Sequence, residues 1–280
     1  MNELSPAQRL ESIADVDRRI KAHPMHRIRI ALDSLVEVLR FVLAPNGQAL
    51  LELLERASTD PETFLSLTPA QQFSPAALRF RADLARQLHN YLASVYTLHA
   101  QAREVVQSRD RNADGNADEL RDEWSRRAGE FDNDPPIAFV MGLRAYVQHY
   151  GQLPIGHRLH VNVVESSGES ELTITMSELD APVRWTAAAR IYIGATEMVD
   201  IRSLFADHLS RTVDLYRWLI EQLIVDSSLL LDEYNELIAE RASVQFGVHL
   251  ETARGLVEPP VTRIRRESDE VALIKGVHDD

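Results

Sequence analysis

The sequence predicts a mainly α-helical fold. Apolar residues recur at three- and four-residue spacing through most of the 280 positions. Several of these runs begin at a Ser-Pro or Pro-Pro pair, which is typical of the first turn of a helix. Only one stretch alternates with the period of a β-hairpin. Together these observations predict a helical bundle with a long central helix, one β-hairpin insertion and a C-terminal helical layer.

The N-terminal part is expected to contain three helices. Ser5 and Pro6 begin the first, which runs from about residue 5 to 22. The second covers about residues 27–43, after Pro24. The tripeptide at residues 45–47, Pro-Asn-Gly, predicts a turn, and a short leucine-rich helix follows it.

The longest periodic segment runs from Ser74 to about Ser108 without an internal Gly or Pro. A helix of this length would be roughly 50 Å long, at a rise of 1.5 Å per residue. The segment therefore predicts the central helix of the bundle. A further helix is expected over residues 118–130.

The stretch from Phe131 to Pro154 concentrates polar side chains at the end of an apolar helix. Pro135 and Pro136 suit the first turn, and Gly151 and Pro154 would end the helix. Its apolar stripe comprises Ile137, Val140, Leu143, Val147 and Tyr150. Arg144, Gln148 and His149 then fall in the last two turns, where they could form a site.

Beyond this helix, the period changes to two and then returns to that of a helix. Residues 157–164 and 171–176 alternate as the two strands of a hairpin. Strong helical patterns follow at residues 201–225 and 229–246. The predicted division is a helical bundle over 1–155, a hairpin over 156–180, C-terminal helices over 181–257, and an extended or disordered tail over 258–280.

Composition narrows the classes of function. The net charge of −13 argues against a protein that coats nucleic acid by bulk electrostatics, although it permits a local basic site. The chain has no cysteine, which excludes disulfides, thiolate zinc sites and a cysteine nucleophile. No segment approaches the ~20 apolar residues of a membrane span, and the N-terminus does not resemble a secretory signal. A cytoplasmic protein without membrane contact is expected.

Two weaker patterns suggest metal sites, and neither leads to a cofactor or metal prediction. Residues 110–118 match the first half of an EF-hand loop, but Arg121 stands where the bidentate glutamate belongs. A polar linker between two helices explains the same composition without an ion. His157 and His160 would face opposite sides of a strand, and His23 and His26 flank Pro24 in an expected loop.

The segment LRAYVQHYGQLP, residues 143–154, resembles the Arg-x4-6-His segment of bacterial HEPN-type proteins. Three other Arg–His pairs have a similar spacing, but only Arg144–His149 also has the helix end, the aromatic flank and the trailing Gly-x-Leu-Pro. The resemblance implies a helical bundle, commonly a homodimer, and a metal-independent ribonuclease of toxin–antitoxin or phage-defence systems. Ala145 stands where the family often has Asn or another polar residue, so the resemblance implies either an active enzyme or an inactive relative.

These residue types suit RNA cleavage without metal. A histidine side chain can exchange a proton near neutral pH, so His149 could act as base or acid, while Arg144 could hold the phosphate. Tyr146 and Gln148 could support them. Five residues apart on an ideal helix, Arg144 and His149 point about 140° apart. Either the final turn unwinds or a second copy of the chain contributes to the site, so the hypothesis predicts a dimer.

Two alternatives stay open at this level. Arg144 could pair with a carboxylate while His149 caps the helix C-terminus, where a cation is favoured. The whole chain could equally be a non-catalytic helical scaffold or regulatory protein whose long helix and acidic surface bind another protein. An antitoxin is a partner that the toxin–antitoxin hypothesis would add. RNA and a second copy of the chain are the partners that the ribonuclease hypothesis predicts.

Overall fold

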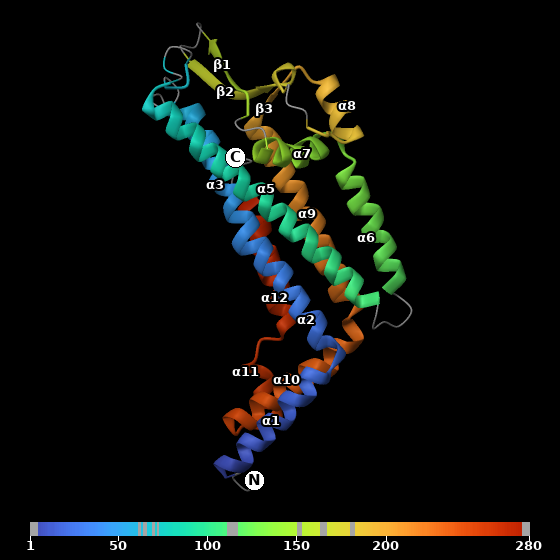
Figure 1. The fold of residues 1–280 in the computed structure, drawn as a ribbon. Coiled ribbons are helices and arrows are strands. Elements are labelled where there is room, and N and C mark those ends of the chain that lie inside the picture. Colours follow the sequence, from blue (N-terminus) through green and yellow to red (C-terminus); the bar gives the residue numbers. More distant parts are fainter. Residues whose placement is uncertain are drawn as a thin grey trace. The chain divides into compact units, whose positions relative to one another are not determined.

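The structure, a computed structural model, describes residues 5–60, 63, 66–68, 71, 73–110, 117–149, 153–162, 167–179 and 183–275 (Figure 1). The mainly α-helical fold is confirmed. The elements before the sheet are α1 (Pro6–Ala22), α2 (Pro24–Val38), the π-helical turn η1 (Leu39–Leu43), α3 (Ala44–Thr59), α5 (Pro75–Asp110), α6 (Ala117–Asp132) and α7 (Pro135–His149). The later elements are β1 (Ile155–Asn162), β2 (Ser167–Thr175), η2 (Met176–Glu178), α8 (Ala187–Ala195), β3 (Met198–Asp200), α9 (Ile201–Asp226), α10 (Ser228–Phe246), α11 (Leu250–Leu256) and α12 (Pro260–Lys275).

The chain divides into two compact units that are not consecutive in sequence. The first unit comprises residues 1–40, 101–122 and 216–280, and the second comprises residues 41–100 and 123–215. These two units differ from the successive segments that the sequence led us to expect, because the long helices α5 and α9 each contribute residues to both units.

In the first unit, helices from both ends of the chain pack together. α1 packs against α10, and α2 packs against α12. Ser5 starts α1 with a capping box, since its side chain accepts from the amide of Gln8 while the Gln8 side chain accepts from the Ser5 amide. The core of this unit includes Leu32, Leu35, Tyr234 and Ile264, all fully or almost fully buried.

The expected extended tail is wrong for residues 260–275, which form α12. Pro260 occupies the first helical position, so the Pro-Pro pair starts a helix here rather than preventing one. Val261, Ile264, Ser268 and Val271 recur at three- and four-residue spacing and are all buried. The charged residues between these positions made the segment look like a solvated end.

The turn expected at residues 45–47 is also wrong, because these residues lie in the first turn of α3. Pro45 has no amide proton, so Phe41 cannot receive the usual helical bond from four residues later. The chain accommodates this with the π-helical turn η1 rather than with a loop. Gly47 is buried, and a Cβ there would lie 2.7 Å from a methyl carbon of Leu209, so close packing explains the glycine.

The second unit contains the sheet, whose strand order is β1-β2-β3 and whose pairs are antiparallel (Figure 1). The predicted hairpin is confirmed, with Ile155 opposite Ile174 and Asn162 opposite Ser167. Leu172, Ile174 and Met176 are buried, as their alternation predicted. The short strand β3 was not predicted. α3 contacts β2, and α7 packs against α8.

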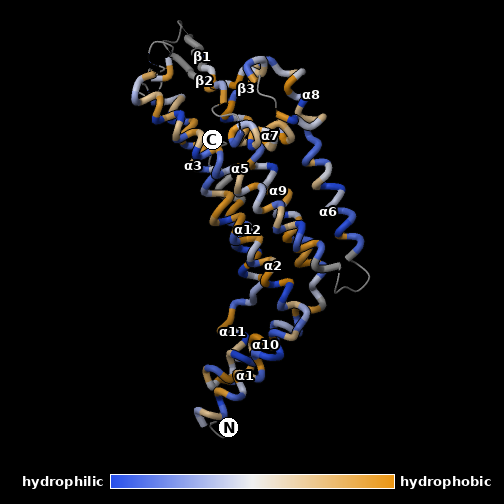
Figure 2. The backbone as a smooth tube through the Cα atoms, viewed as in Figure 1, coloured by the Kyte–Doolittle hydropathy of each residue, from blue (hydrophilic) through white to orange (hydrophobic). Residues whose placement is uncertain are grey.

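The predicted central helix is confirmed as α5, a helix of 36 residues. Ser74 caps it by accepting a hydrogen bond from the amide of Ala77. The predicted helices at 118–130, 201–225 and 229–246 correspond to α6, α9 and α10. Figure 2 shows that α6 is mostly hydrophilic whereas α7 is far more hydrophobic. The EF-hand-like positions 112, 114 and 115 lie outside the described residues.

Candidate functional site

The candidate site lies at the C-terminal end of α7, in the second unit. The helix begins after Asp134, whose carbonyl accepts from the amide of Ala138 and whose carboxylate accepts from Arg211 at 2.7 Å. Its middle is buried: Phe139, Val140 and Leu143 have no exposed surface. Because Phe139, Val140 and Leu143 lie in the core, they hold the middle of the helix in place within the unit.

Aromatic rings pack closely along α7. Trp185 stacks on Phe139 with a centroid distance of 5.5 Å and an interplanar angle of 25°. Tyr146 also stacks with Trp185, at 6.5 Å. Gly142 lies under the same indole, and a Cβ on it would come within 2.6 Å of two ring carbons. Tyr146, named above as a possible supporting residue, is therefore buried in this aromatic core.

Arg144 lies against α5. Its guanidinium carbon is 4.0 Å from the centroid of the Tyr96 ring, a cation–π arrangement. Its Nε is buried without a hydrogen-bond acceptor in the described part of the chain. Within the same residues, the carboxylate partner that the non-catalytic alternative expected for Arg144 is not found, and an aromatic ring takes its place.

His149 is the last residue of α7, and both His149 and Gln148 are exposed. Tyr150 and Gly151, which belong to the predicted helix end, lie outside the described residues. Arg144 thus contacts a ring of α5, while His149 stands at the exposed end of the helix. This arrangement agrees with the 140° separation of the two residues on an ideal helix.

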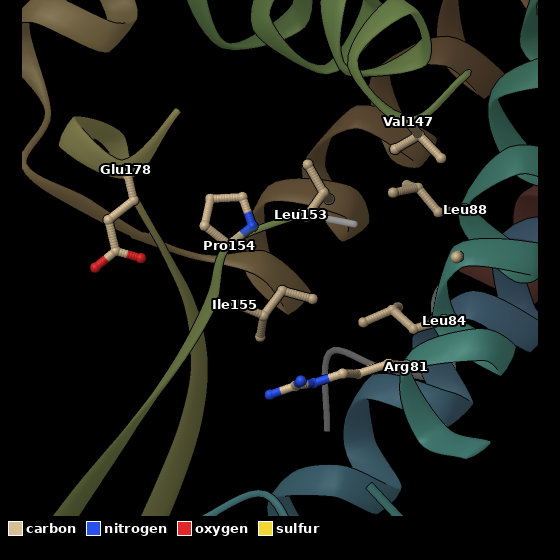
Figure 3. A pocket seen from close by; sticks show the side chains of 9 residues that line it. Arg81, Leu84, Leu88, Val147, Leu153, Pro154, Ile155 and Glu178 are labelled. Carbon is tan, nitrogen blue, oxygen red and sulfur yellow. The ribbon is translucent and has the colours of Figure 1, made fainter. Parts of the chain in front are cut away.

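A cavity of about 210 Å³ adjoins this helix end (Figure 3). Leu84 and Leu88 of α5, Val147 of α7, and Leu153 and Ile155 provide apolar walls. Arg81 and Glu178 lie on opposite sides of the cavity in Figure 3. Arg81 has no carboxylate partner among the residues that the structure describes. The cavity can therefore hold a flat or apolar group with an anionic substituent near Arg81.

A second polar cluster in this unit was not foreseen. The hydroxyl of Tyr91 lies 2.6 Å from Nδ1 of His208, and both residues are buried. Burial raises the pKa of Tyr91, so the phenol keeps its proton, and the tautomer of His208 decides which of the two groups donates. Burial, and to a lesser extent Arg211 and His99, lowers the pKa of His208 to about 3. The imidazole is therefore neutral, and its Nε2 has no partner within the described chain.

The burial of His208 could have been predicted from its position in the sequence. It lies three residues after Phe205, on the same apolar face of the helix predicted at 201–225. A histidine at such a position is expected to be buried and bonded to a polar partner. The identity of that partner, Tyr91, follows only from tertiary packing.

The arginines of the other Arg–His spacings form ordinary ion pairs, and the first histidine caps a helix. Arg19 pairs with Glu240 at 2.7 Å, and Arg202 lies 3.5 Å from Glu55. His23 accepts from the amide of Met25 through Nδ1, and its Nε2 lies 3.5 Å from Glu233. The side chains of His157 and His160 are not described.

Within the described ranges, no group of three or more His, Asp or Glu side chains is placed to hold a metal ion. In the same ranges, each helix is too short or too polar to cross a membrane. In comparisons with protein-family models, curated proteins and solved structures, the chain has no match. The residues and their geometry are therefore the basis for proposing a function.

Proposed function

We propose that the chain is a HEPN-like, metal-independent endoribonuclease acting in bacterial defence or growth control, with Arg144 and His149 as its active pair. The observation that carries the proposal is the placement of this pair at one end of a buried helix. His149 is exposed at the last residue, and Arg144 has a buried Nε without an acceptor in the described chain. A cytoplasmic location and RNA as the substrate belong to the same proposal.

In this proposal the two side chains supply the two requirements of RNA cleavage. The imidazole of His149 removes the 2′-hydroxyl proton, and that oxygen attacks the adjacent phosphorus. The P–O5′ bond then breaks, and a proton from an acid or from water neutralises the leaving oxygen. Arg144 binds the phosphate oxygens as negative charge develops on them. The cavity beside Val147 offers apolar walls for a base, with Arg81 available for a neighbouring phosphate.

Because one chain directs Arg144 and His149 differently, the proposal requires a homodimer in which each site takes one residue from each copy. Mixing two inactive variants tests this requirement. In a mixed dimer of Arg144→Ala and His149→Ala chains, one site contains neither residue and the other contains both. Random pairing then restores about a quarter of the wild-type sites. If the mixture stays inactive although mixed dimers form, the shared site is excluded.

The primary experiment follows RNA integrity in EDTA with purified wild type, Arg144→Ala and His149→Ala. The matched controls are Arg79→Ala and His89→Ala, which remove exposed residues of the same types from α5. Cleavage by the wild type and the controls, with at least a hundredfold loss in both site variants, supports the proposal. Equal behaviour of all five folded proteins would assign Arg144 and His149 to the structure alone.

One structural observation favours the scaffold alternative. Phe246, Leu250 and Leu256, within and just before α11, are exposed apolar residues close in sequence. Such residues can anchor a partner protein. A scaffold function predicts that Phe246→Ser and Leu256→Ser abolish binding of that partner, while Arg144→Ala and His149→Ala leave it unchanged. The ribonuclease proposal predicts the reverse pattern for RNA cleavage.

A further inference from the structure

A second cavity, of about 260 Å³, lies wholly in the first unit. Helices α1, α2 and α10 and the start of α12 form its walls. It is lined by more polar and charged groups than the cavity beside α7. The side chains that matter here are Asp17, Lys21, His26, Arg29, Tyr234 and Arg241.

The charge on the walls of this cavity is positive although the whole chain is acidic. Three cations, Lys21, Arg29 and Arg241, face a single carboxylate, that of Asp17. Nε of Arg241 donates to Asp17 at 2.6 Å. Outside the lining, Arg29 donates to Asp33, which also accepts from Arg263 at 2.7 Å. Lys21 has no carboxylate partner among the residues described.

The polar side chains of Arg29, Tyr234 and His26 lie together on the walls of this cavity. The buried Nε of Arg29 has no acceptor within the described ranges. The hydroxyl of Tyr234 lies 3.2 Å from Nδ1 of His26. Desolvation, followed by the charges of Arg29 and Lys21, lowers the pKa of His26. The imidazole is therefore neutral at neutral pH, and the two cations are close enough to act on it.

The N-terminal end of α12 lies at this cavity. Pro260, its first residue, lines the cavity, and α12 has 16 residues. The first-turn amides of a helix have no acceptor within the helix, and the macrodipole makes this end positive. Helix N-termini of this kind bind phosphate groups when side-chain cations stand beside them.

We propose that this cavity binds a small phosphate-bearing ligand. The walls carry an excess of two positive charges, which matches a phosphate dianion better than a single carboxylate. Arginine presents paired donors to phosphate oxygens, and lysine contributes a point charge. The site is independent of Arg144 and His149, which belong to the other unit, so it can be tested whether or not the chain cleaves RNA.

The test is calorimetric titration of the full chain with inorganic phosphate and, separately, with adenosine 5′-monophosphate, at constant ionic strength. The variant Lys21→Gln removes one lining cation. Arg18→Gln is its matched control, because Arg18 lies on the same helix but pairs with Asp15 at 3.2 Å outside the cavity. We expect saturable binding to the wild type, about tenfold weaker binding to Lys21→Gln, and a change under twofold in Arg18→Gln.

The two ligands distinguish the sources of phosphate. Tighter binding of the nucleotide assigns the site to a phosphate ester, and equal binding assigns it to free phosphate. No saturable binding of either ligand at millimolar concentration would overturn the proposal. Equal weakening in Lys21→Gln and Arg18→Gln would also overturn it, since that result reports only the overall charge of the chain.

Discussion

Among the histidines that the structure describes, His208 has the environment that differs most from water. It is buried and neutral, it shares a hydrogen bond with Tyr91, and its pKa is lowered to about 3. In the unfolded chain its pKa returns to about 6.5. Between these two values the unfolded state binds a proton that the folded state does not bind. Stability is therefore lost as the pH falls below about 6.5, and this loss is complete near pH 3.

This difference predicts that lowering the pH from 7 to 5 removes about 2 kcal/mol of stability through His208 alone. Urea unfolding of the wild type and His208→Gln at both pH values checks the prediction, with His89→Gln as the exposed control. The wild type and the control should share the pH dependence, and His208→Gln should lose about 2 kcal/mol of it. An NMR titration of the wild type in which His208 protonates near pH 6 would contradict the assignment.

Gly142 and Gly129 provide a matched pair of helical glycines. A Cβ at Gly142 would lie 2.6 Å from Trp185, whereas a Cβ at Gly129 would meet nothing within 4 Å. Gly142→Ala should destabilise the chain by about 1–3 kcal/mol through overpacking. Gly129→Ala should stabilise it by up to about 1 kcal/mol, because alanine favours a helix. Urea unfolding with tryptophan fluorescence measures both, and a neutral Gly142→Ala would show that the indole can move away.

At the scale of elements, the helices with Pro or Ser-Pro starts and continuous apolar stripes could be predicted from sequence. α1, α5 and α7 begin within a residue of the expected positions, because capping and the first turn are local chemistry. The start of α3 could not be predicted, since Pro45 and Gly47 carry a strong turn signal. Packing of Gly47 against Leu209, distant in sequence, outweighs that signal.

α12 yields a prediction about the C-terminal segment. Ile264 is fully buried, so Ile264→Ala should cost about 2–5 kcal/mol. Arg266→Ala, which removes only exposed ion pairs on the same helix, should cost less than about 1 kcal/mol. Thermal or urea unfolding distinguishes the two. Equal stability of Ile264→Ala and the wild type would mean that α12 contributes nothing to the core.

At the scale of the whole molecule, uninterrupted helices connect the two units. α5 has no Gly or Pro after its first residue, and α9 has neither. Helix formation is cooperative along such a backbone, so the two units should unfold together. Trp185 lies in the second unit and Trp218 in the first. Single-tryptophan chains that retain one or the other should give the same urea midpoint, and two separate midpoints would contradict this prediction.

The candidate sites show how far sequence reasoning extends across the molecule. Arg144 and His149 could be located because they lie on one helix with readable ends. The contact of Arg144 with Tyr96 and the burial of Tyr146 could not be read, since both depend on which helices meet. The proposed phosphate-binding cavity could not be predicted from local sequence patterns. Lys21, Arg29 and Arg241 come from three helices, and the lining also includes Pro260 of a fourth.

Lys21 allows this cavity to be labelled selectively, because the sequence contains so few lysines. Lys21 and Lys275 are the only lysines, so the chain offers very few primary amines to an acylating reagent. A mild N-hydroxysuccinimide ester would mark Lys21 without any engineered residue, and peptide mass spectrometry would read the yield against Lys275. A ligand bound in the cavity would then shield Lys21 of the wild-type chain from the reagent, while Lys275 would react as before.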